Sequence, residues 1–526
     1  MAQRGPETEA LGALLLRAAR LAPDRLAVVE GGVRLTFAEL LRQATAFARS
    51  LLRLGVAPDD VVTVQLPNWW ETQVVTYGTL LAGAVHNPVV PIYREHELGF
   101  IVRQARPRVL VVPVELRGHG HLATAMSVVA GLPDPPVVVA VRATAPLPPG
   151  VLDFSGLLAA DGPQDELPAL PDPDAVALLM YTSGSTADPK GVLHSSRTLL
   201  HEARQVAQLC RLGADDAVFM ASPLTHITGL LFASLLPVDL CLPTVLQDRW
   251  DAAAAVELIE EHGCTFTVSA TTFLLGLTEV YERRGTPSSL RVFVCGGAEI
   301  GPVLVARARR AMAARVVRTY GSTEFPTFCL GDPYGDEDAA AETDGQPVPL
   351  SAWRVDEEAG GELLVKGAEL FLGYLDPALD ADAFTEDGYF RTGDVVRLDE
   401  RGACTVVGRI KDIIIRAGEN LSASEIEDHL QQHPLVEEVA VVAVPDPVLG
   451  ERACAYVVPR PGGVLDLPEL RTFLAARGLA VQKAPERLEL VPRLPRTASG
   501  KVQKFLLRDT VRQLLAAEDR AQPGEG

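Results

Sequence analysis

The sequence predicts an α/β protein with a large N-terminal domain of layered α/β subdomains and a small α+β C-terminal domain. Apolar β-branched runs alternate with helix-like segments over about the first 400 residues, which favours helices layered on mostly parallel sheets. This alternation gives way to shorter segments near residue 410. With 526 residues, 48% hydrophobic and 22% charged, the chain can bury more than one core. We therefore expect domains at residues 1–410 and 411–526.

The large domain begins with well-marked elements. Thr36 and Glu39 have the spacing of a capping box, which begins a helix that should end near Gly55. Residues 145–173 are rich in proline and indicate an irregular connection. Buried strands are expected at residues 61–66, 109–112, 137–141, 175–180, 292–295 and 316–319.

The small domain should begin near Lys411 and comprise roughly 115 residues. Ser424 and Glu427 have the spacing of a helix cap. Residues 439–444 and 453–458 are apolar and β-branched, and they predict two strands. A helix followed by strands is typical of an α+β domain.

Composition excludes several classes of function. A net charge of −20 argues against nucleic acid as the main partner, so an anionic ligand would have to be met by local Lys and Arg. The seven cysteines are scattered without a Cys-x-x-Cys pair, which indicates reduced core residues in a cytoplasmic protein and no zinc site. No apolar run has the length of a membrane span, and the N-terminus lacks a signal-peptide pattern.

The segment 181–191 reads Tyr-Thr-Ser-Gly-Ser-Thr-Ala-Asp-Pro-Lys-Gly and follows a predicted buried strand. Backbone N–H groups, short hydroxyls and one cation together suit a polyphosphate, whose oxygens need many donors and little side-chain bulk. The spacing is not that of a Walker A loop. A flexible surface loop is the alternative interpretation of such a Thr/Ser/Gly-rich turn.

Further short motifs occur at residues 296–299, 320–324, 389–394, 408–412, 416–420 and 495–501. In this order and at these spacings, the chain resembles the acyl-adenylate-forming superfamily, which includes acyl-CoA synthetases, nonribosomal adenylation domains and beetle luciferases. The resemblance covers nearly the whole chain. It implies ATP, Mg²⁺ and coenzyme A as cofactors, a small β-barrel in the large domain, and a mobile C-terminal domain. The implied reaction forms acyl-AMP from a carboxylic acid and then transfers the acyl group to a thiol.

The resemblance assigns the phosphate loop and the metal site residue by residue. Ala187 departs from the family, which has glycine there, and alanine lacks the conformational freedom of glycine. Thr323 matches a ligand of the α-phosphate and Glu324 a ligand of Mg²⁺, for which a hard carboxylate oxygen is suited. The residues that match the grip on the β- and γ-phosphates are Thr182, Ser183, Gly184, Ser185, Thr186 and Lys190.

Other matches concern the nucleoside and the two half-reactions. Asp394 matches the ribose-binding carboxylate, and Arg409 a second nucleotide contact. Lys501 matches the lysine that bridges the substrate carboxylate and the α-phosphate, a position suited to a compact ammonium. Lys411 matches the hinge, and Gly418 a backbone position passed by the pantetheine arm. The segments that match those flanking adenine contain Gly297, Ala298, Glu299, Tyr320 and Gly321, for which a plain strand-to-helix turn is the alternative.

The expected substrate is an aliphatic, alicyclic or aryl acid without an α-amino group. His226 matches the residue at the carboxylate entrance, with a buried core histidine as the alternative. Residues 231–235 contain no acid to pair with a substrate ammonium, which would be costly to bury alone. Gly321 stands where acetate-specific relatives have tryptophan, so a larger acid should fit. Residues 66–71 and 91–95 resemble those of medium-chain and cyclohexanecarboxylate ligases.

Two other functions remain open at this stage. An acyl-AMP ligase that loads an acyl carrier protein would use the same hinge and the same Gly418 segment. A non-catalytic scaffold that retains the fold would not need Lys501, Glu324 and Asp394. The sequence does not determine the identity of the acid or the oligomeric state, and a homodimer is one of the open forms.

Overall fold

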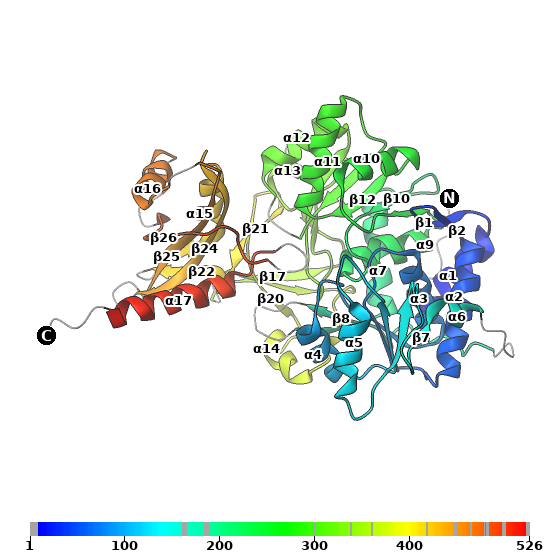
Figure 1. Cartoon of the computed structure of the whole chain (residues 1–526). Helices are drawn as coiled ribbons and strands as arrows, with labels where there is room; N and C mark the ends of the chain where they lie inside the picture. Colours follow the sequence, from blue (N-terminus) through cyan, green and yellow to red (C-terminus); the bar gives the residue numbers. More distant parts are fainter. Residues whose placement is uncertain are drawn as a thin grey trace. The chain divides into compact units, whose positions relative to one another are not determined.

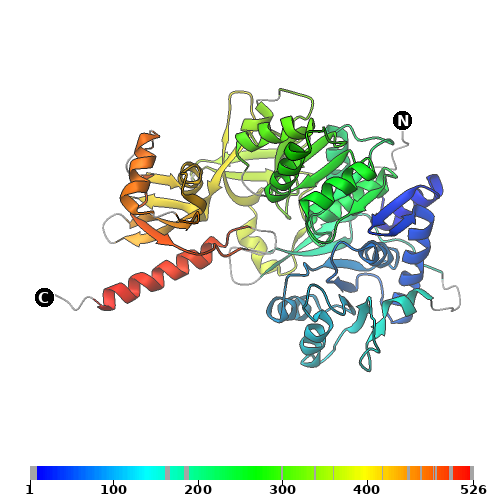
Figure 2. The same ribbon diagram turned by 45° about the horizontal axis from the view of Figure 1, so that its top comes forward.

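The computed structural model contains two compact units (Figures 1 and 2). The first comprises Met1–Ala352, Val365–Phe390 and Asp399–Cys404, and the second Trp353–Leu364, Arg391–Leu398 and Thr405–Gly526. Helices and sheets occur in both units, which confirms the α/β class. The residues that the structure describes are 9–159, 166–182, 189–297, 300–336, 339–358, 361–416, 419–446, 450–462, 465–477, 479, 483–496 and 501–521.

An eight-stranded sheet in the first unit has the order β19-β9-β8-β4-β3-β5-β6-β7. From β8 to the edge strand β7, neighbouring strands pair in parallel. At the other edge, β9 pairs antiparallel with both β8 and β19. Both faces are buried, because Val111 joins one core and Leu110 the core on the other side. The strands are β3 (Val61–Val64), β4 (Val85–Pro88), β5 (Val109–Pro113), β6 (Val137–Val141), β7 (Leu152–Asp153), β8 (Val176–Thr182), β9 (Lys190–Ser195) and β19 (Gly373–Tyr374).

A nine-stranded sheet in the same unit has the order β16-β15-β14-β13-β12-β10-β11-β1-β2. The strands β14, β13, β12, β10, β11 and β1 pair in parallel. The antiparallel strands β15 and β16 complete one edge, and the antiparallel strand β2 completes the other. The strands are β1 (Leu26–Glu30), β2 (Val33–Thr36), β10 (Val218–Met220), β11 (Thr244–Leu246), β12 (Phe266–Ser269), β13 (Val292–Cys295), β14 (Arg315–Tyr320), β15 (Cys329–Leu330) and β16 (Gln346–Pro347).

Helices cover these sheets in layers (Figure 1). The largest core lies between the two sheets and contains α1 (Leu11–Leu21), α2 (Phe37–Arg53), α3 (Trp70–Leu81), α7 (Ser196–Leu209) and α9 (Leu236–Asp239). Helices α4 (Glu95–Ala105) and α5 (His121–Ala130) cover the other face of the eight-stranded sheet. Helices α10 (Ala252–Glu261), α11 (Thr271–Arg284) and α12 (Pro302–Met312) cover the other face of the nine-stranded sheet, next to α13 (Ala339–Glu342).

Several predicted elements are confirmed. Helix α2 begins with a reciprocal capping box, in which the Glu39 amide donates to Thr36 Oγ1 at 3.2 Å and the Thr36 amide to Glu39 Oε2 at 2.9 Å. The helix ends at Arg53, just before Gly55, whose φ of 81° is in the left-handed region. The predicted strands correspond to β3, β5, β6, β8, β13 and β14.

The prediction of an irregular connection over residues 145–173 is wrong in part. Strand β7 and helix α6 (Phe154–Ala159) lie within it. The Phe154 ring is buried against Phe47 and Trp70, with centroids 5.6 and 6.3 Å away, and this contact holds the short helix on α2 and α3. Such a distant partner cannot be read from the proline content of the segment.

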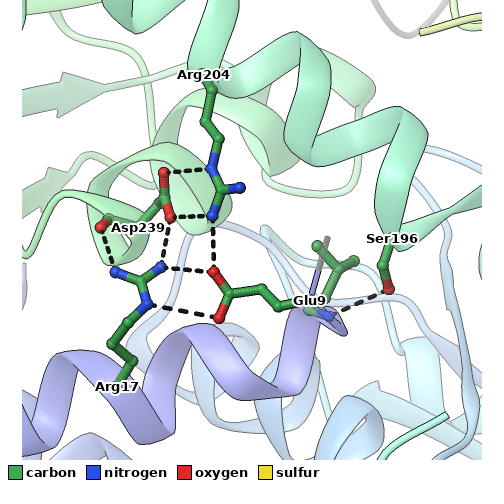
Figure 3. Close-up of polar contacts among 6 residues, drawn as sticks. Glu9, Arg17, Ser196, Arg204 and Asp239 are labelled. Atoms are coloured by element: carbon green, nitrogen blue, oxygen red, sulfur yellow. Dashed lines mark hydrogen bonds and ion pairs between the residues drawn. The ribbon is translucent and has the colours of Figure 1, made fainter. Parts of the chain in front are cut away.

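Four charged side chains attach helix α1 to the rest of the first unit (Figure 3). Arg17 of α1 and Arg204 of α7 both donate to Glu9 and to Asp239 of α9, over distances of 2.5 to 3.0 Å. All four side chains are at most 19% exposed. Because charges alternate around the network, each of these partly or fully buried ions faces two partners of opposite sign.

The second unit contains a sheet of order β23-β22-β25-β24, with β26 beside β25. Helices α15 (Ala423–Gln431) and α16 (Leu467–Ala476) pack on one face, and α17 (Lys504–Ala521) on the other. Ser422, two residues before the predicted cap, caps α15 through the Glu425 amide at 3.2 Å. The strands are β22 (Ile413–Arg416), β23 (Glu419–Ser422), β24 (Val436–Asp446), β25 (Gly450–Pro459) and β26 (Arg487–Leu490).

A further sheet pairs in the order β17-β18-β20-β21 and lies mostly in the second unit. Its strands are β17 (Ala352–Asp356), β18 (Glu362–Lys366), β20 (Phe390–Leu398) and β21 (Cys404–Arg409). The order is that of an open sheet, so the small β-barrel stays a prediction, as does the boundary at residue 411.

The seven cysteines are free, and all except the half-buried Cys241 are buried, as expected of core residues. Among the described residues, every helix is too short or too polar to cross a membrane.

Candidate active site

The segment that contains Thr323 and Glu324 follows strand β14 as a tight turn. The Ser322 amide donates to the Phe325 carbonyl at 2.9 Å, and the Phe325 amide to Ser322 Oγ at 3.2 Å. A Cβ at Gly321 would lie 1.9 Å from the Pro326 carbonyl oxygen, so only glycine fits this turn. The turn leaves Thr323 buried and Glu324 half-buried.

The main chain of this turn is held by His194 of strand β9. His194 Nε2 lies 2.7 Å from the Thr323 carbonyl oxygen, and Nδ1 lies 3.0 Å from Thr198 Oγ1. Since a carbonyl oxygen can only accept, Nε2 must carry the proton. Burial lowers the pKa of His194 to about 4, so the ring is neutral at physiological pH.

The Glu324 carboxylate is held by Tyr374, a residue that the sequence analysis did not predict. The Tyr374 hydroxyl donates to Glu324 Oε1 at 2.9 Å. Burial, and then the charge of Glu324, raise the pKa of Tyr374, so its hydroxyl keeps its proton. A tyrosine in the apolar stretch 370–375 has no chemical signature in the sequence, because such residues are usually plain core.

The same tyrosine ring faces the predicted phosphate-binding lysine. Lys190 Nζ lies 4.9 Å from the centroid of the Tyr374 ring, within the range of a cation–π contact. Lys190 begins strand β9 and pairs with Thr182 at the end of β8. The predicted loop residues Ser183, Gly184, Ser185 and Thr186 lie outside the described residues.

A half-buried carboxylate and a lysine that contact the same tyrosine are suited to a metal-bound polyphosphate. Glu324 Oε1 is oriented by a hydroxyl, and carboxylate oxygens are ligands that Mg²⁺ prefers. The residues present therefore fit the Mg²⁺ site that the sequence predicts.

The two segments predicted to flank adenine lie side by side. Strands β13 and β14 are parallel neighbours, so their carboxyl ends meet at one edge of the sheet. A Cβ at Gly296 would lie 2.5 Å from Thr319 Cγ2, which shows how closely the two ends approach. Gly297 follows with a φ of 82°, and Tyr320 ends β14. Ala298 and Glu299 lie outside the described residues.

His226 lies at the start of the short helix α8 (Ile227–Gly229), which continues as the π-helix η1 (Leu230–Leu235). Its half-buried ring accepts from the Thr228 amide through Nδ1 at 3.4 Å. A Cβ at Gly229 would lie 2.0 Å from the Pro223 carbonyl oxygen, so this turn also requires glycine. The η1 residues are buried in the core, which leaves Thr228 as the more exposed side chain here.

In the second unit, Asp394 and Arg409 are brought together. Arg409 Nε lies 2.9 Å from Asp394 Oδ1, and the Asp394 side chain is only 6% exposed. A buried carboxylate needs such a partner. The two predicted nucleotide contacts are therefore also partners of each other.

The predicted hinge and the predicted catalytic lysine belong to connected segments of the second unit. Lys411 lies in the 3₁₀ turn η3 (Ile410–Asp412), and Asp412 accepts from Arg508 of α17 at 2.6 Å. Lys501 is exposed and lies three residues before α17 begins. Gly418 lies outside the described residues.

Behind the turn, the first unit buries a polar cluster that the sequence analysis also missed. Glu202 of α7 is fully buried and accepts from the Thr327 hydroxyl at 2.5 Å. Burial raises the pKa of Glu202 to about 8, and nearby Glu369 adds to this shift. Glu369 is also fully buried, 3.7 Å from His201 Nε2. A lone glutamate on an otherwise ordinary helix gives no sequence signal for such a site.

Comparisons with known proteins identify relatives over most of the chain. The model of the AMP-binding enzyme family matches residues 15–375, and that of the AMP-binding enzyme C-terminal domain matches residues 425–501. The chain is 35% identical to the medium-chain fatty-acid–CoA ligase of Escherichia coli, covering 94% of this chain and 89% of that protein. It is 34% identical to the salicyl-AMP ligase / salicyl-S-ArCP synthetase of Mycobacterium tuberculosis, covering 96% and 90%. The crystal structure of ATP-bound MatB from Rhodopseudomonas palustris matches with a TM-score of 0.84 at 27% identity, covering 96% and 99%.

Proposed function

This chain belongs to the AMP-binding enzyme family, and from that premise we propose that it is an ATP-dependent acyl-CoA ligase. In the first step, an oxygen of the substrate carboxylate forms a bond to the α-phosphorus of ATP, and pyrophosphate leaves. In the second step, the sulfur of coenzyme A bonds to the acyl carbon, AMP leaves with the electron pair, and the thiol loses its proton.

The arrangement of Lys190, Tyr374 and Glu324 carries this proposal. A carboxylate can approach the triphosphate only if positive charge screens both anions. Lys190 would supply one cation, and Glu324 would hold Mg²⁺, which would neutralise negative charge on the phosphates. Both side chains contact one buried tyrosine, which would keep them near each other before ATP binds.

The remaining residues take the roles that the sequence predicts for them. Thr323 would donate to the α-phosphate. Asp394 would accept from the ribose hydroxyls, with Arg409 oriented by the same carboxylate. The phosphate loop would contribute Thr182, Ser183, Gly184, Ser185 and Thr186, and the adenine site Gly297, Ala298, Glu299, Tyr320 and Gly321.

Lys501 would act in the first half-reaction only. Its ammonium would bridge the attacking carboxylate and the α-phosphate, and rotation about Lys411 would then withdraw it and present Gly418 to the pantetheine arm. The Asp412–Arg508 ion pair supports a coupling between the hinge and Lys501, because it joins the residue after Lys411 to the helix that follows Lys501.

The substrate is an aliphatic, alicyclic or aryl acid that enters past His226. The described residues of α8 and η1 contain no carboxylate, so a substrate ammonium would find no counter-charge on these two elements. The names of the two curated relatives include a fatty acid and an aryl acid. We further propose that the metal is Mg²⁺, that the protein is cytoplasmic, and that a homodimer is one form to test.

A second candidate is an acyl-AMP ligase that loads an acyl carrier protein. It is favoured by the M. tuberculosis relative, whose name includes an S-ArCP synthetase and whose identity to this chain nearly equals that of the CoA ligase. Both candidates share the first half-reaction.

Acid-dependent exchange of labelled pyrophosphate into ATP tests this shared step without any thiol. We expect exchange with medium-chain or aryl acids and none with α-amino acids. An enzyme that exchanges only with α-amino acids would overturn the substrate class, and no exchange with any acid would overturn the proposed function.

A further inference from the structure

We propose that Tyr374 is a positioning residue for the adenylation reaction, because it holds the Glu324 carboxylate, and through it the divalent cation, in register with Lys190. The inference rests on the proposed function, which assigns Glu324 to the metal and Lys190 to the phosphates. Neither the family match nor the sequence motifs assign a role to this tyrosine.

The hydrogen bond between Tyr374 and Glu324 has an ordinary length and is shielded by the buried ring. The Tyr374 hydroxyl lies 2.9 Å from Glu324 Oε1, and the tyrosine is only 5% exposed. An ionised carboxylate can only accept, so the phenol must donate. Hydrogen bonds to charged groups are stronger than those between neutral groups, particularly where water is largely excluded.

The tyrosine is itself fixed on all sides. Its main chain pairs with Val192 of strand β9, and its amide donates to Asp380 Oδ1 at 2.9 Å. Its ring packs edge-on against Phe371, with centroids 4.9 Å apart. A side chain held by a strand pairing, a capped amide and a neighbouring ring cannot move away from Glu324 without disturbing the core.

The second contact of the Tyr374 ring is Lys190, which lies in strand β9 together with Val192. Lys190 Nζ lies 4.9 Å from the ring centroid, and Lys190 begins strand β9, two residues before Val192. A single aromatic ring therefore contacts both the proposed metal carboxylate and the proposed phosphate lysine. This shared contact would keep the two groups that meet ATP close to each other.

Removal of the hydroxyl should affect the carboxylate and leave the turn in place. The main chain of the turn has separate anchors, since the Phe371 amide donates to the Glu324 carbonyl at 2.9 Å and His194 to the Thr323 carbonyl. The variant Tyr374→Phe keeps the ring under Lys190 and removes only the donor. Loss of a partner that orients a metal ligand typically weakens metal affinity roughly 10- to 100-fold.

The chain offers a matched control at Tyr281. This buried tyrosine in helix α11 donates to Glu260 Oε1 at 2.6 Å, in a part of the first unit remote in sequence from the turn. Tyr281→Phe therefore removes the same kind of tyrosine–carboxylate hydrogen bond without touching Glu324 or Lys190. A general loss of stability would affect both variants, whereas loss of metal positioning would affect only one.

The test measures Mn²⁺ binding by electron paramagnetic resonance in the full-length protein with α,β-methylene-ATP. We expect the wild type and Tyr281→Phe to bind Mn²⁺ equally, and Tyr374→Phe to bind it at least about tenfold more weakly. In steady-state assays, Tyr374→Phe should raise the KM for Mg²⁺ by a similar factor, and high Mg²⁺ should restore most of kcat. In a Glu324→Gln background, Tyr374→Phe should change little, because the acceptor charge is already absent.

Each outcome decides between the two levels of the proposal. If the wild type fails to bind Mn²⁺ with the analogue, the proposed function is wrong at the metal site. If the wild type binds and Tyr374→Phe binds equally well, the positioning role is refuted while the function stands. Equal losses in Tyr374→Phe and Tyr281→Phe would also refute it, because they would indicate a purely structural tyrosine.

Discussion

Replacement of Glu202 by glutamine should stabilise the protein, and the gain should depend on pH. Glu202 is fully buried with a pKa of about 8, against 4.5 for an ordinary glutamate, chiefly because burial penalises its charged form. The Glu202 carboxyl therefore stays protonated in the folded state up to a pH of about 8, whereas in the unfolded chain it ionises above pH 4.5. The contribution of Glu202 to the stability of the wild type is thus fully present below pH 4.5 and is lost progressively as the pH rises towards 8.

The size of the effect follows from the difference between the two pKa values. Each unit of difference corresponds to about 1.4 kcal/mol, so the wild type loses roughly 3 kcal/mol by pH 7 and roughly 5 kcal/mol by pH 9. Glutamine is uncharged and nearly isosteric, and its carbonyl oxygen can still accept from the Thr327 hydroxyl. Glu202→Gln should therefore be more stable than the wild type by up to these amounts at neutral and alkaline pH.

Urea denaturation from pH 5 to pH 9, followed by tryptophan fluorescence, measures this directly. Three of the four tryptophans, Trp69, Trp70 and Trp250, lie in the first unit with Glu202, so the signal reports mainly that unit. The exposed carboxylate of Glu257, whose side chain is 75% accessible, provides the control Glu257→Gln, which should have almost no effect. A stability difference for Glu202→Gln that stayed constant with pH, or that favoured the wild type at pH 9, would refute the reasoning.

Three further predictions test other parts of the structure. Asp239→Asn leaves one carboxylate for the buried Arg17 and the partly buried Arg204, so the free energy of unfolding should fall by roughly 2–4 kcal/mol in denaturant titrations. A loss below about 0.5 kcal/mol would mean that the network is energetically neutral. Lys501→Ala should nearly abolish adenylation in pyrophosphate exchange yet spare thioester formation from supplied acyl-AMP, and equal loss of both steps would contradict its role. Lys411→Pro should stiffen the hinge and impair one half-reaction in single-turnover assays, whereas unchanged turnover would remove Lys411 from the mechanism.

Local signals in the sequence were sufficient for much of the fold. The capping box at Thr36 and Glu39 works within four residues, and the apolar runs of β6 and β13 have the predicted bounds. The cap of α15 was misplaced by two residues, because Ser422 and Ser424 both offer a hydroxyl and both lie beside the Val407 carbonyl. Ser422 is the cap because strand β23 ends there and the Glu425 amide donates to its hydroxyl, and the end of that strand depends on its pairing with β22.

The candidate site was predictable where one residue carries a recognisable chemistry and hidden where a contact joins distant segments. Lys190 and Glu324 belong to motifs, but the residues that contact the motif containing Glu324 are distant from it in sequence. Tyr374 reaches Glu324 across 50 positions, His194 reaches Thr323 across 129, and Thr327 reaches Glu202 across 125. Such pairs depend on how the strands are ordered, which no periodicity or spacing in one sequence determines.

Mass spectrometry of the products from a pooled carboxylic-acid panel with ATP, Mg²⁺ and coenzyme A tests the central claim most directly. The account predicts AMP, pyrophosphate and the coenzyme A thioester of an aliphatic, alicyclic or aryl acid. Acyl-AMP without any thioester would instead identify a carrier protein as the acceptor. Formation of neither acyl-AMP nor thioester from any acid in the panel would contradict the account.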